Sequence, residues 1–128
     1  MKKKLKNILL IDDNGDDNFY HSFILEEIGC CQDITVFEHA EKALKFLKST
    51  ENMDLPELIL LDINMPGMNG WEFINLYNQI TNIKQSKSKL YILSSSNNPD
   101  DKIRAENLGI VSGYLVKPLE EKDLEKIL

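Results

Sequence analysis

The chain has 128 residues, of which 42% are hydrophobic and 28% charged, so it is long enough for one domain with a hydrophobic core. Its net charge of -6 argues against non-specific binding to nucleic acids or to an anionic membrane surface. Its apolar runs, about four residues long, are too short for a membrane span or a signal peptide, so we expect a cytoplasmic protein.

The first predicted elements are a strand over residues 7–11 and a helix over about 16–28. The strand is continuously apolar, as in a sheet that is buried on both faces, and it ends at Asp12 and Asp13. Two residues are suited to cap the ends of the helix, Asn14 and Gly29. We expect four large apolar side chains to share one face of this helix: Phe19, Phe23, Ile24 and Ile28.

Strands and helices continue to alternate along the rest of the chain. Four further strands are expected, over residues 32–37, 58–61, 89–94 and 112–116. Four further helices are expected, over residues 39–48, 70–81, 99–108 and 119–128. Because each connection is long enough for a crossover helix, the strands should form a parallel sheet with helices on both faces. The sequence therefore predicts a doubly wound α/β fold with five strands and five helices.

The strand over residues 58–61 organises this pattern, because four apolar residues end at a single acid, Asp62. Ligands bind at the carboxyl ends of strands in open α/β sheets. A stiff turn follows, which contains Pro66, Gly67 and Gly70. Taken alone, Asp62 is also well explained as a residue that caps this turn.

Polar residues follow three other predicted strands: Asp12 and Asp13 the first, Ser94 the fourth and Lys117 the fifth. In a parallel sheet these residues meet Asp62 at one edge. We prefer Ser94 to its neighbour Ser95 for the hydroxyl of this pocket. Several carboxylates together are suited to Mg²⁺, and Mg²⁺ with a lysine is suited to a phosphoryl group. Asp62 would then be a nucleophile that forms an aspartyl phosphate.

In order and spacing, these motifs resemble the receiver domain of two-component response regulators, the CheY-like superfamily. The resemblance covers nearly the whole chain and depends on four motifs: Asp12-Asp13, Asp62 with the segment Met65-Pro66-Gly67-Met68-Asn69-Gly70, Ser94, and Lys117-Pro118. It implies a flavodoxin-like sheet with strand order 2-1-3-4-5. It also implies a single receiver domain over residues 1–128, with no output domain.

The resemblance implies a role for each residue of the pocket. Asp62 would accept a phosphoryl group from a phosphohistidine on a sensor histidine kinase or a histidine phosphotransfer protein. Direct ligands of Mg²⁺ would be Asp13, Asp62 and the backbone carbonyl of Asn64, whereas Asp12 would act mainly through bound water. Lys117 would pair with the phosphoryl oxygens.

Two further residues match the conformational switch of the family. The hydroxyl of Ser94 would move to bond the phosphoryl group, and Tyr114 would change its rotamer. The bond between Lys117 and Pro118 is expected to be cis. An unidentified output protein would then bind the fourth helix, the fifth strand and the last helix. The last helix is short, which indicates a trimmed chain or a reduced partner face, and we expect a monomer or a weak dimer.

Two other functions are compatible with parts of the pattern. An Mg²⁺-dependent phosphohydrolase with an aspartyl-phosphate intermediate usually has a second acid two residues after the nucleophile, where this chain has Asn64. A flavin-binding module needs a hydroxyl-rich phosphate loop after the first strand, where residues 12–17 are acidic. We therefore expect no enzymatic activity beyond self-catalysed phosphorylation and slow autodephosphorylation.

Overall fold

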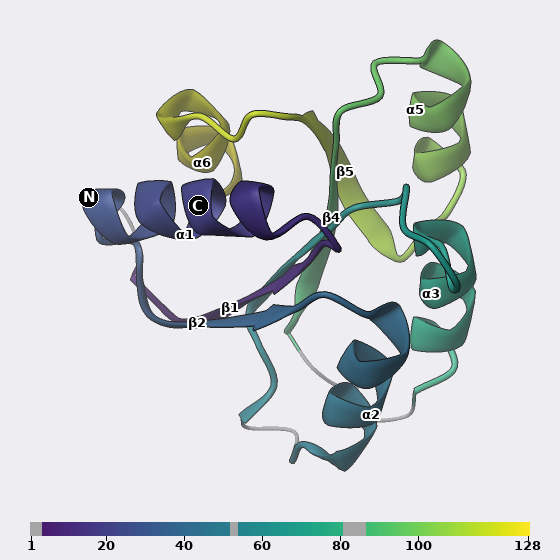
Figure 1. The fold of residues 1–128 in the computed structure, drawn as a ribbon, viewed down its shortest axis with the longest axis horizontal. Coiled ribbons are helices and arrows are strands. Elements are labelled where there is room, and N and C mark those ends of the chain that lie inside the picture. Colours follow the sequence, from purple (N-terminus) through teal and green to yellow (C-terminus); the bar gives the residue numbers. More distant parts are fainter. Residues whose placement is uncertain (1–3, 52–53, 81–86) are drawn as a thin grey trace.

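The computed structural model describes residues 4–51, 54–80 and 87–128, which form one five-stranded parallel sheet with helices on both faces (Figure 1). The strands are β1 (Leu5–Ile11), β2 (Cys31–Phe37), β3 (Leu58–Leu61), β4 (Lys89–Ser94) and β5 (Val111–Val116). The helices are α1 (Gly15–Ile28), α2 (Ala40–Ser49), α3 (Gly70–Tyr77), α5 (Pro99–Glu106) and α6 (Glu121–Ile127).

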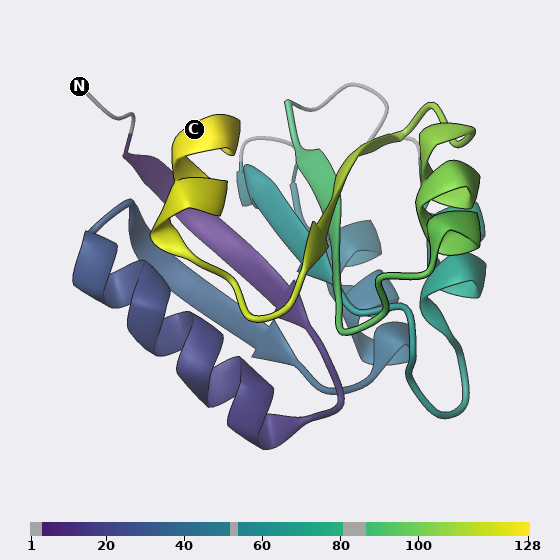
Figure 2. The ribbon, with the colours of Figure 1, turned by 90° about the horizontal axis from the view of Figure 1, so that it is seen from above.

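The strand order is β2-β1-β3-β4-β5, and neighbouring strands are parallel throughout. Helices α1 and α6 cover one face of the sheet, and α2, α3 and α5 cover the other (Figures 1 and 2). This arrangement confirms the predicted doubly wound α/β fold with the order 2-1-3-4-5.

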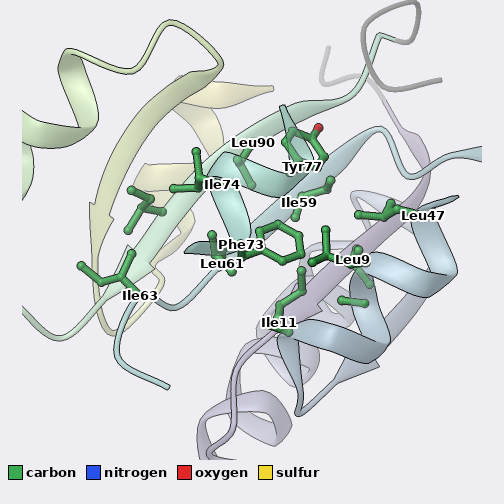
Figure 3. Packing of buried hydrophobic residues seen from close by; sticks show 14 of the residues in the cluster. Leu9, Ile11, Leu47, Ile59, Leu61, Ile63, Phe73, Ile74, Tyr77 and Leu90 are labelled. Carbon is green, nitrogen blue, oxygen red and sulfur yellow. The ribbon is translucent and has the colours of Figure 1, made fainter. Parts of the chain in front are cut away.

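The adjacent inner strands β1 and β3 are buried on both faces, so their side chains divide between two hydrophobic clusters. The first cluster packs against α2 and α3 (Figure 3) and takes Leu9, Ile11, Ile59 and Leu61 from the strands. The second packs against α1 and α6 and takes Ile8, Leu10, Leu58 and Leu60. The continuous apolar runs in the sequence therefore reflect a sheet sandwiched between two helical layers.

The parallel register brings the ends of the strands to one level. Ile11 is paired with Leu61, and the amide of Asp62 donates a hydrogen bond to the carbonyl of Ile11 at 2.9 Å. At the end of the β4–β5 pair, the amide of Lys117 donates to the carbonyl of Ser94 at 2.8 Å. The polar residues that follow these strands therefore leave the sheet along the same edge.

Most helix boundaries lie within a few residues of the prediction. The expected caps of α1 are present: the side chain of Asn14 accepts from the amides of Asp16 and Asp17, and Gly29 adopts the left-handed conformation with φ 69°. Helix α3 ends at Tyr77, and beyond its C-cap the amides of Gln79 and Ile80 bond only three residues back, to Leu76 and Tyr77, both at 3.1 Å. Residue 81, where this helix was expected to end, lies outside the described residues.

The predicted apolar face of α1 is wrong for two of its four residues. Phe19 and Phe23 are 77% and 51% exposed, and the side chains that α1 buries are Asn18, His21 and Leu25. The first turns of α1 lie over the polar end of the sheet, where the Asn18 amide donates to the backbone carbonyl of Asp12 at 2.7 Å. A polar contact therefore sets the orientation of this helix.

Across residues 4–51, 54–80 and 87–128, no helix is both long and apolar enough to pass through a lipid bilayer.

Gly70 fixes the end of the loop that follows Asp62. Its amide donates to the carbonyl of Ile63 at 3.0 Å, so the first residue of α3 lies against the backbone just beyond β3. A Cβ atom at position 70 would lie 2.4 Å from the Cα of Ile63. Only glycine permits this close approach.

We therefore expect Gly70→Ala to lower the free energy of unfolding by about 1–3 kcal/mol, because the backbone must shift to accept the methyl group. Gly109→Ala is the control, since a Cβ at position 109 has no atom within 4 Å, and its effect should stay within about 0.5 kcal/mol. Urea unfolding of both variants tests this, and equal stability of the two would contradict the steric argument.

Candidate functional site

Three carboxylates lie together at the carboxyl edge of the sheet. Asp12 and Asp13 follow β1, Asp62 follows the neighbouring β3, and one oxygen from each lies within 4.8 Å of the others. Asp12 and Asp62 are buried, with 5% and 6% of their surfaces exposed, whereas Asp13 is exposed. A set of carboxylate oxygens with one open side fits Mg²⁺, which prefers oxygen ligands and keeps several waters.

Asp12 and Asp62 each cap the turn that follows them, but with one oxygen only. Oδ1 of Asp12 accepts from the amide of Asn14 at 3.0 Å, and Oδ1 of Asp62 accepts from the amide of Asn64 at 3.2 Å. The second oxygen of each carboxylate faces Lys117. Turn capping therefore orients both carboxylates and leaves the second oxygen of each directed into the pocket.

Lys117, at the end of β5, brings a cation into this cluster and is 12% exposed in its side chain. Its Nζ lies 2.6 Å from Oδ2 of Asp12, 2.8 Å from Oδ2 of Asp17 and 3.8 Å from Oδ2 of Asp62. The peptide bond from Lys117 to Pro118 is cis, as the resemblance implies.

The contact between Asp17 and Lys117 was not predicted from the sequence. In the sequence, Asp17 contributes only to the acidic segment 12–17 that argues against a phosphate loop. Asp17 belongs to the first turn of the helix that follows β1, so a parallel sheet places it at the same edge as the lysine that follows β5. Topology thus places Asp17 at this edge, whereas its contact with Lys117 depends on how α1 packs against the sheet.

The predicted switch residues lie on either side of the loop after β4. Ser94 is fully buried at the strand end, whereas Ser95 is exposed, and the hydroxyl of Ser94 accepts from the amide of Ser96 at 3.2 Å. The Tyr114 hydroxyl donates to the backbone carbonyl of the same Ser96 at 2.7 Å. The side chain of Ser96 donates to Asp101 of α5 at 2.7 Å. Ser96, which the sequence analysis did not single out, therefore contacts both residues and α5.

Burial dominates the electrostatics of the pocket. Burial, with a smaller contribution from the neighbouring charge of Asp12, raises the pKa of Asp62 to about 6, although Lys117 opposes the shift. Burial alone lowers the pKa of Lys117, but the hydrogen bonds to Asp12 and Asp17 and the charges of Asp62 and Asp12 together outweigh burial, so the pKa is raised and the ammonium stays charged. Burial also lowers the pKa of His21, so this imidazole is neutral at pH 7.

The cluster therefore has more acids than bases: Asp12, Asp17 and Asp62 surround the ammonium of Lys117, and Asp13 lies beside Asp12 and Asp62. Like charges this close repel one another, and they also repel any anion that approaches. A phosphoryl group can enter such a pocket only with an additional cation, which the three clustered carboxylates are suited to hold.

Without a metal, we expect Asp62→Asn to be more stable than wild type above pH 6, by on the order of 1 kcal/mol. The folded-state pKa of Asp62 is about 6 against an ordinary 3.8. Wild type therefore loses stability as pH rises through this window, and the whole penalty applies above it. Asparagine cannot ionise, so the variant lacks this loss.

Thermal melts of both proteins from pH 4 to pH 8 in a chelator measure this difference. Adding Mg²⁺ at neutral pH should raise the melting temperature of wild type more than that of the variant, because the metal binds the folded state. If Asp62→Asn melts below wild type at pH 7.5 in chelator, the prediction is wrong. In that case the stability gained when the carboxylate caps its turn exceeds the cost of burying its charge.

The sequence and the fold both match one family. A sequence model described as the response regulator receiver domain matches residues 8–128. The chain is 36% identical over 121 residues to the nitrate/nitrite response regulator protein NarL of Escherichia coli strain K12, an alignment that covers 94% of this chain and 52% of NarL. It therefore spans about half the length of that relative. It is also 31% identical over 126 residues to the response regulator Rcp1 of Synechocystis sp. strain PCC 6803, which covers 96% of this chain and 84% of Rcp1.

Solved structures agree with this match. A two-component response regulator from Cytophaga hutchinsonii superimposes with a TM-score of 0.88 at 34% identity, covering 98% of this chain and 95% of that one. The chemotaxis response regulator CheY4 of Vibrio cholerae has the same fold, with a TM-score of 0.78 at 23% identity. From its sequence, its strand order and these relatives, this chain belongs to the response regulator receiver domain family of two-component systems.

Proposed function

We propose that this receiver domain is a phosphorylation switch in which Asp62 accepts a phosphoryl group from a phosphohistidine. The donor is a histidine kinase or a histidine phosphotransfer protein. The observation that carries this proposal is the state of Asp62: it is buried, its Oδ1 is held by the amide of Asn64, and its Oδ2 faces Lys117 at 3.8 Å. An oriented carboxylate with one available oxygen beside a cation is suited to attack phosphorus.

In the transfer step, Oδ2 of Asp62 attacks the phosphorus of the phosphohistidine. A phosphorus–oxygen bond forms and the phosphorus–nitrogen bond breaks, so the imidazole nitrogen leaves with the electron pair and takes a proton from water. Asp62 must be ionised to attack, and a pKa of about 6 leaves it ionised at neutral pH. The ammonium of Lys117 stabilises the negative charge on the phosphoryl oxygens.

Asp12, Asp13 and Asp62, with the backbone carbonyl of Asn64, would hold Mg²⁺ in this pocket. Bound Mg²⁺ supplies the positive charge that offsets the carboxylates and the phosphoryl oxygens. This assignment is supported by the clustered oxygens of the three acids and by the open side at the exposed Asp13.

The signal would leave the pocket through the loop after β4. The Ser94 hydroxyl bonds no acceptor among the described residues, so it is available to donate to a phosphoryl oxygen on Asp62. That movement would alter its bond with Ser96, and hence the position of the carbonyl that holds Tyr114. A shift in this two-state arrangement would change the face formed by α5, β5 and α6, where the output partner binds.

The alternative function, an Mg²⁺-dependent phosphohydrolase, is less well supported. Asn64 occupies the position of the second acid, and its amide cannot transfer a proton. Its side chain is also exposed. We therefore expect a phosphoryl group on Asp62 to persist, as a signal requires.

Incubation with acetyl phosphate and Mg²⁺, followed by intact-mass measurement, tests the phosphorylation. Wild type should gain one phosphoryl group and Asp62→Asn none, and Asp13→Ala should react at least tenfold more slowly if it weakens the metal site. Asp33→Asn changes an exposed acid of β2 and serves as the control that keeps the wild-type rate. Steady release of phosphate with no adduct would support the hydrolase and overturn the switch.

The phosphodonor is expected to contact α1. This helix begins two residues after Asp13 and exposes three aromatic side chains: Phe19, Tyr20 and Phe23. Exposed aromatic residues that gather on one helix mark protein-binding surfaces and often contribute most of the binding energy. A donor seated there would present its phosphohistidine at the adjoining pocket.

We expect Phe19→Ala and Phe23→Ala to slow transfer from a phosphorylated protein donor by about tenfold, because they remove contacts of that surface. A panel of phosphorylated histidine kinases and phosphotransfer proteins supplies the donor, selected as the one that labels wild type fastest. The rate with acetyl phosphate should not change. Ile103→Ala, at a 55% exposed residue of α5, is the control. Unchanged transfer in both phenylalanine variants would remove α1 from the donor interface.

A further inference from the structure

We infer that Asp17 is a positioning residue for Lys117, which it holds in the orientation that phosphoryl transfer needs. The inference rests on the proposed function of Asp62 and adds a residue that the motifs of the family resemblance do not include. It starts from one observation: the Nζ of Lys117 donates to two carboxylates, Asp12 at 2.6 Å and Asp17 at 2.8 Å. Asp62 is the third acid around it, at 3.8 Å.

An ammonium group has three N–H donors in a fixed tetrahedral arrangement. Two of them are taken by Asp12 and Asp17, so the direction of the third is determined. Asp62 lies beyond hydrogen-bond distance but within reach of charge attraction. A phosphoryl group on Oδ2 of Asp62 would bring new acceptor oxygens toward this remaining donor. The two acids therefore orient the donor before the reaction begins, which is the form of preorganisation that lowers a barrier.

Asp12 alone would not fix Lys117, because the lysine side chain has four carbons with free rotation and a single bond leaves it able to turn. Asp17 provides a second anchor from a different element. Its own position is well determined: its amide donates to the cap residue Asn14 at 3.1 Å. The neighbouring Asn18 ties the same turn of α1 to the backbone of Asp12. The lysine is thus held between β1 and the first turn of α1.

The location of Asp17 argues against a role in stability alone. An acid in the first turn of a helix is favourable for the helix dipole, and Asp16 provides the same charge one residue earlier. The side chain of Asp17 is 38% exposed, so solvent screens its ion pair and little stability is expected from it. What distinguishes Asp17 from Asp16 is the contact with Lys117, which Asp16 does not make among the described residues.

Removing the charge of Asp17 has two separable effects on the reaction. The lysine loses its second anchor, which lowers the maximal rate of phosphorylation. The pocket also becomes less negative, which eases the approach of an anionic donor and lowers its KM. If Asp17 acted only through the overall charge of the pocket, removing its charge would lower the KM without reducing the maximal rate. Loss of a residue that only supported the fold would lower the maximal rate in proportion to the folded fraction, which thermal melts reveal, and would leave the KM unchanged.

The test compares wild type, Asp17→Asn and Asp16→Asn in phosphorylation by acetyl phosphate with Mg²⁺. Both variants remove one negative charge from the first turn of α1, and thermal melts establish the folded state of each. We expect the maximal rate of Asp17→Asn to fall by about three- to tenfold with a KM no higher than wild type, and Asp16→Asn to keep the wild-type rate. A rate of Asp17→Asn equal to or above wild type, or equal losses in both variants, would overturn the inference.

A second measurement needs no phosphorylation. The ammonium protons of Lys117 can be followed by nuclear magnetic resonance in metal-free protein, where two carboxylates should slow their exchange with water. The exchange should accelerate in Asp17→Asn and stay unchanged in Asp16→Asn, and the absence of acceleration would contradict the anchor. If wild type is never phosphorylated on Asp62, the proposed function fails, whereas this measurement still decides whether Asp17 holds Lys117.

Discussion

The pairing of β1 with β3 is the constraint on which the rest of this structure depends. Their register places Ile11 opposite Leu61, so the residues that follow, Asp12 and Asp62, leave the sheet at the same level. The amide of Asp62 bonds to the carbonyl of Ile11, which locks this alignment by one hydrogen bond beyond the last paired residues. A shift of one residue would turn one acid toward the opposite helical layer and dismantle the cluster.

This alignment forces two acids into a buried position, and the structure compensates for the charge in two ways. Each carboxylate accepts an amide hydrogen bond from its own turn, and Lys117 lies against their second oxygens. Asp62 also has a raised pKa, which reflects its burial more than the repulsion by Asp12. A buried carboxylate whose charge is only partly compensated is costly for folding, but it is more basic than an exposed one, which suits the nucleophile proposed for this position.

The sequence predicted the fold because its signals are periodic and local. The apolar run before Asp62 and the alternation of strands with helices require a parallel sheet, and the caps at Asn14 and Gly29 mark the ends of α1. The orientation of α1 was not predictable in this way. A hydrophobic stripe indicated Phe19, whereas the buried residue is Asn18, whose contact with the backbone of Asp12 is tertiary.

The candidate site was predictable only where a residue ends a strand. Asp12, Asp13, Asp62, Ser94 and Lys117 all do so, and topology alone brings them to one edge. Asp17 and Ser96 lie within a helix and a loop, so their contacts depend on how α1 and the loop after β4 fold back over the edge. The cause of the raised pKa of Asp62 was equally hidden, because the depth of a side chain is a property of the packed structure.

Ser96 links the pocket to β5 and α5, and it does so mainly through its backbone. Its amide bonds to Ser94 and its carbonyl accepts from Tyr114, while only the bond to Asp101 uses its hydroxyl. Replacing the side chain would thus leave two of these three links in place. During evolution the amino acid at this position can therefore change without breaking the hydrogen bonds to Ser94 and Tyr114. A comparison of related sequences is therefore expected to show variation at position 96, although this residue links Ser94 to Tyr114.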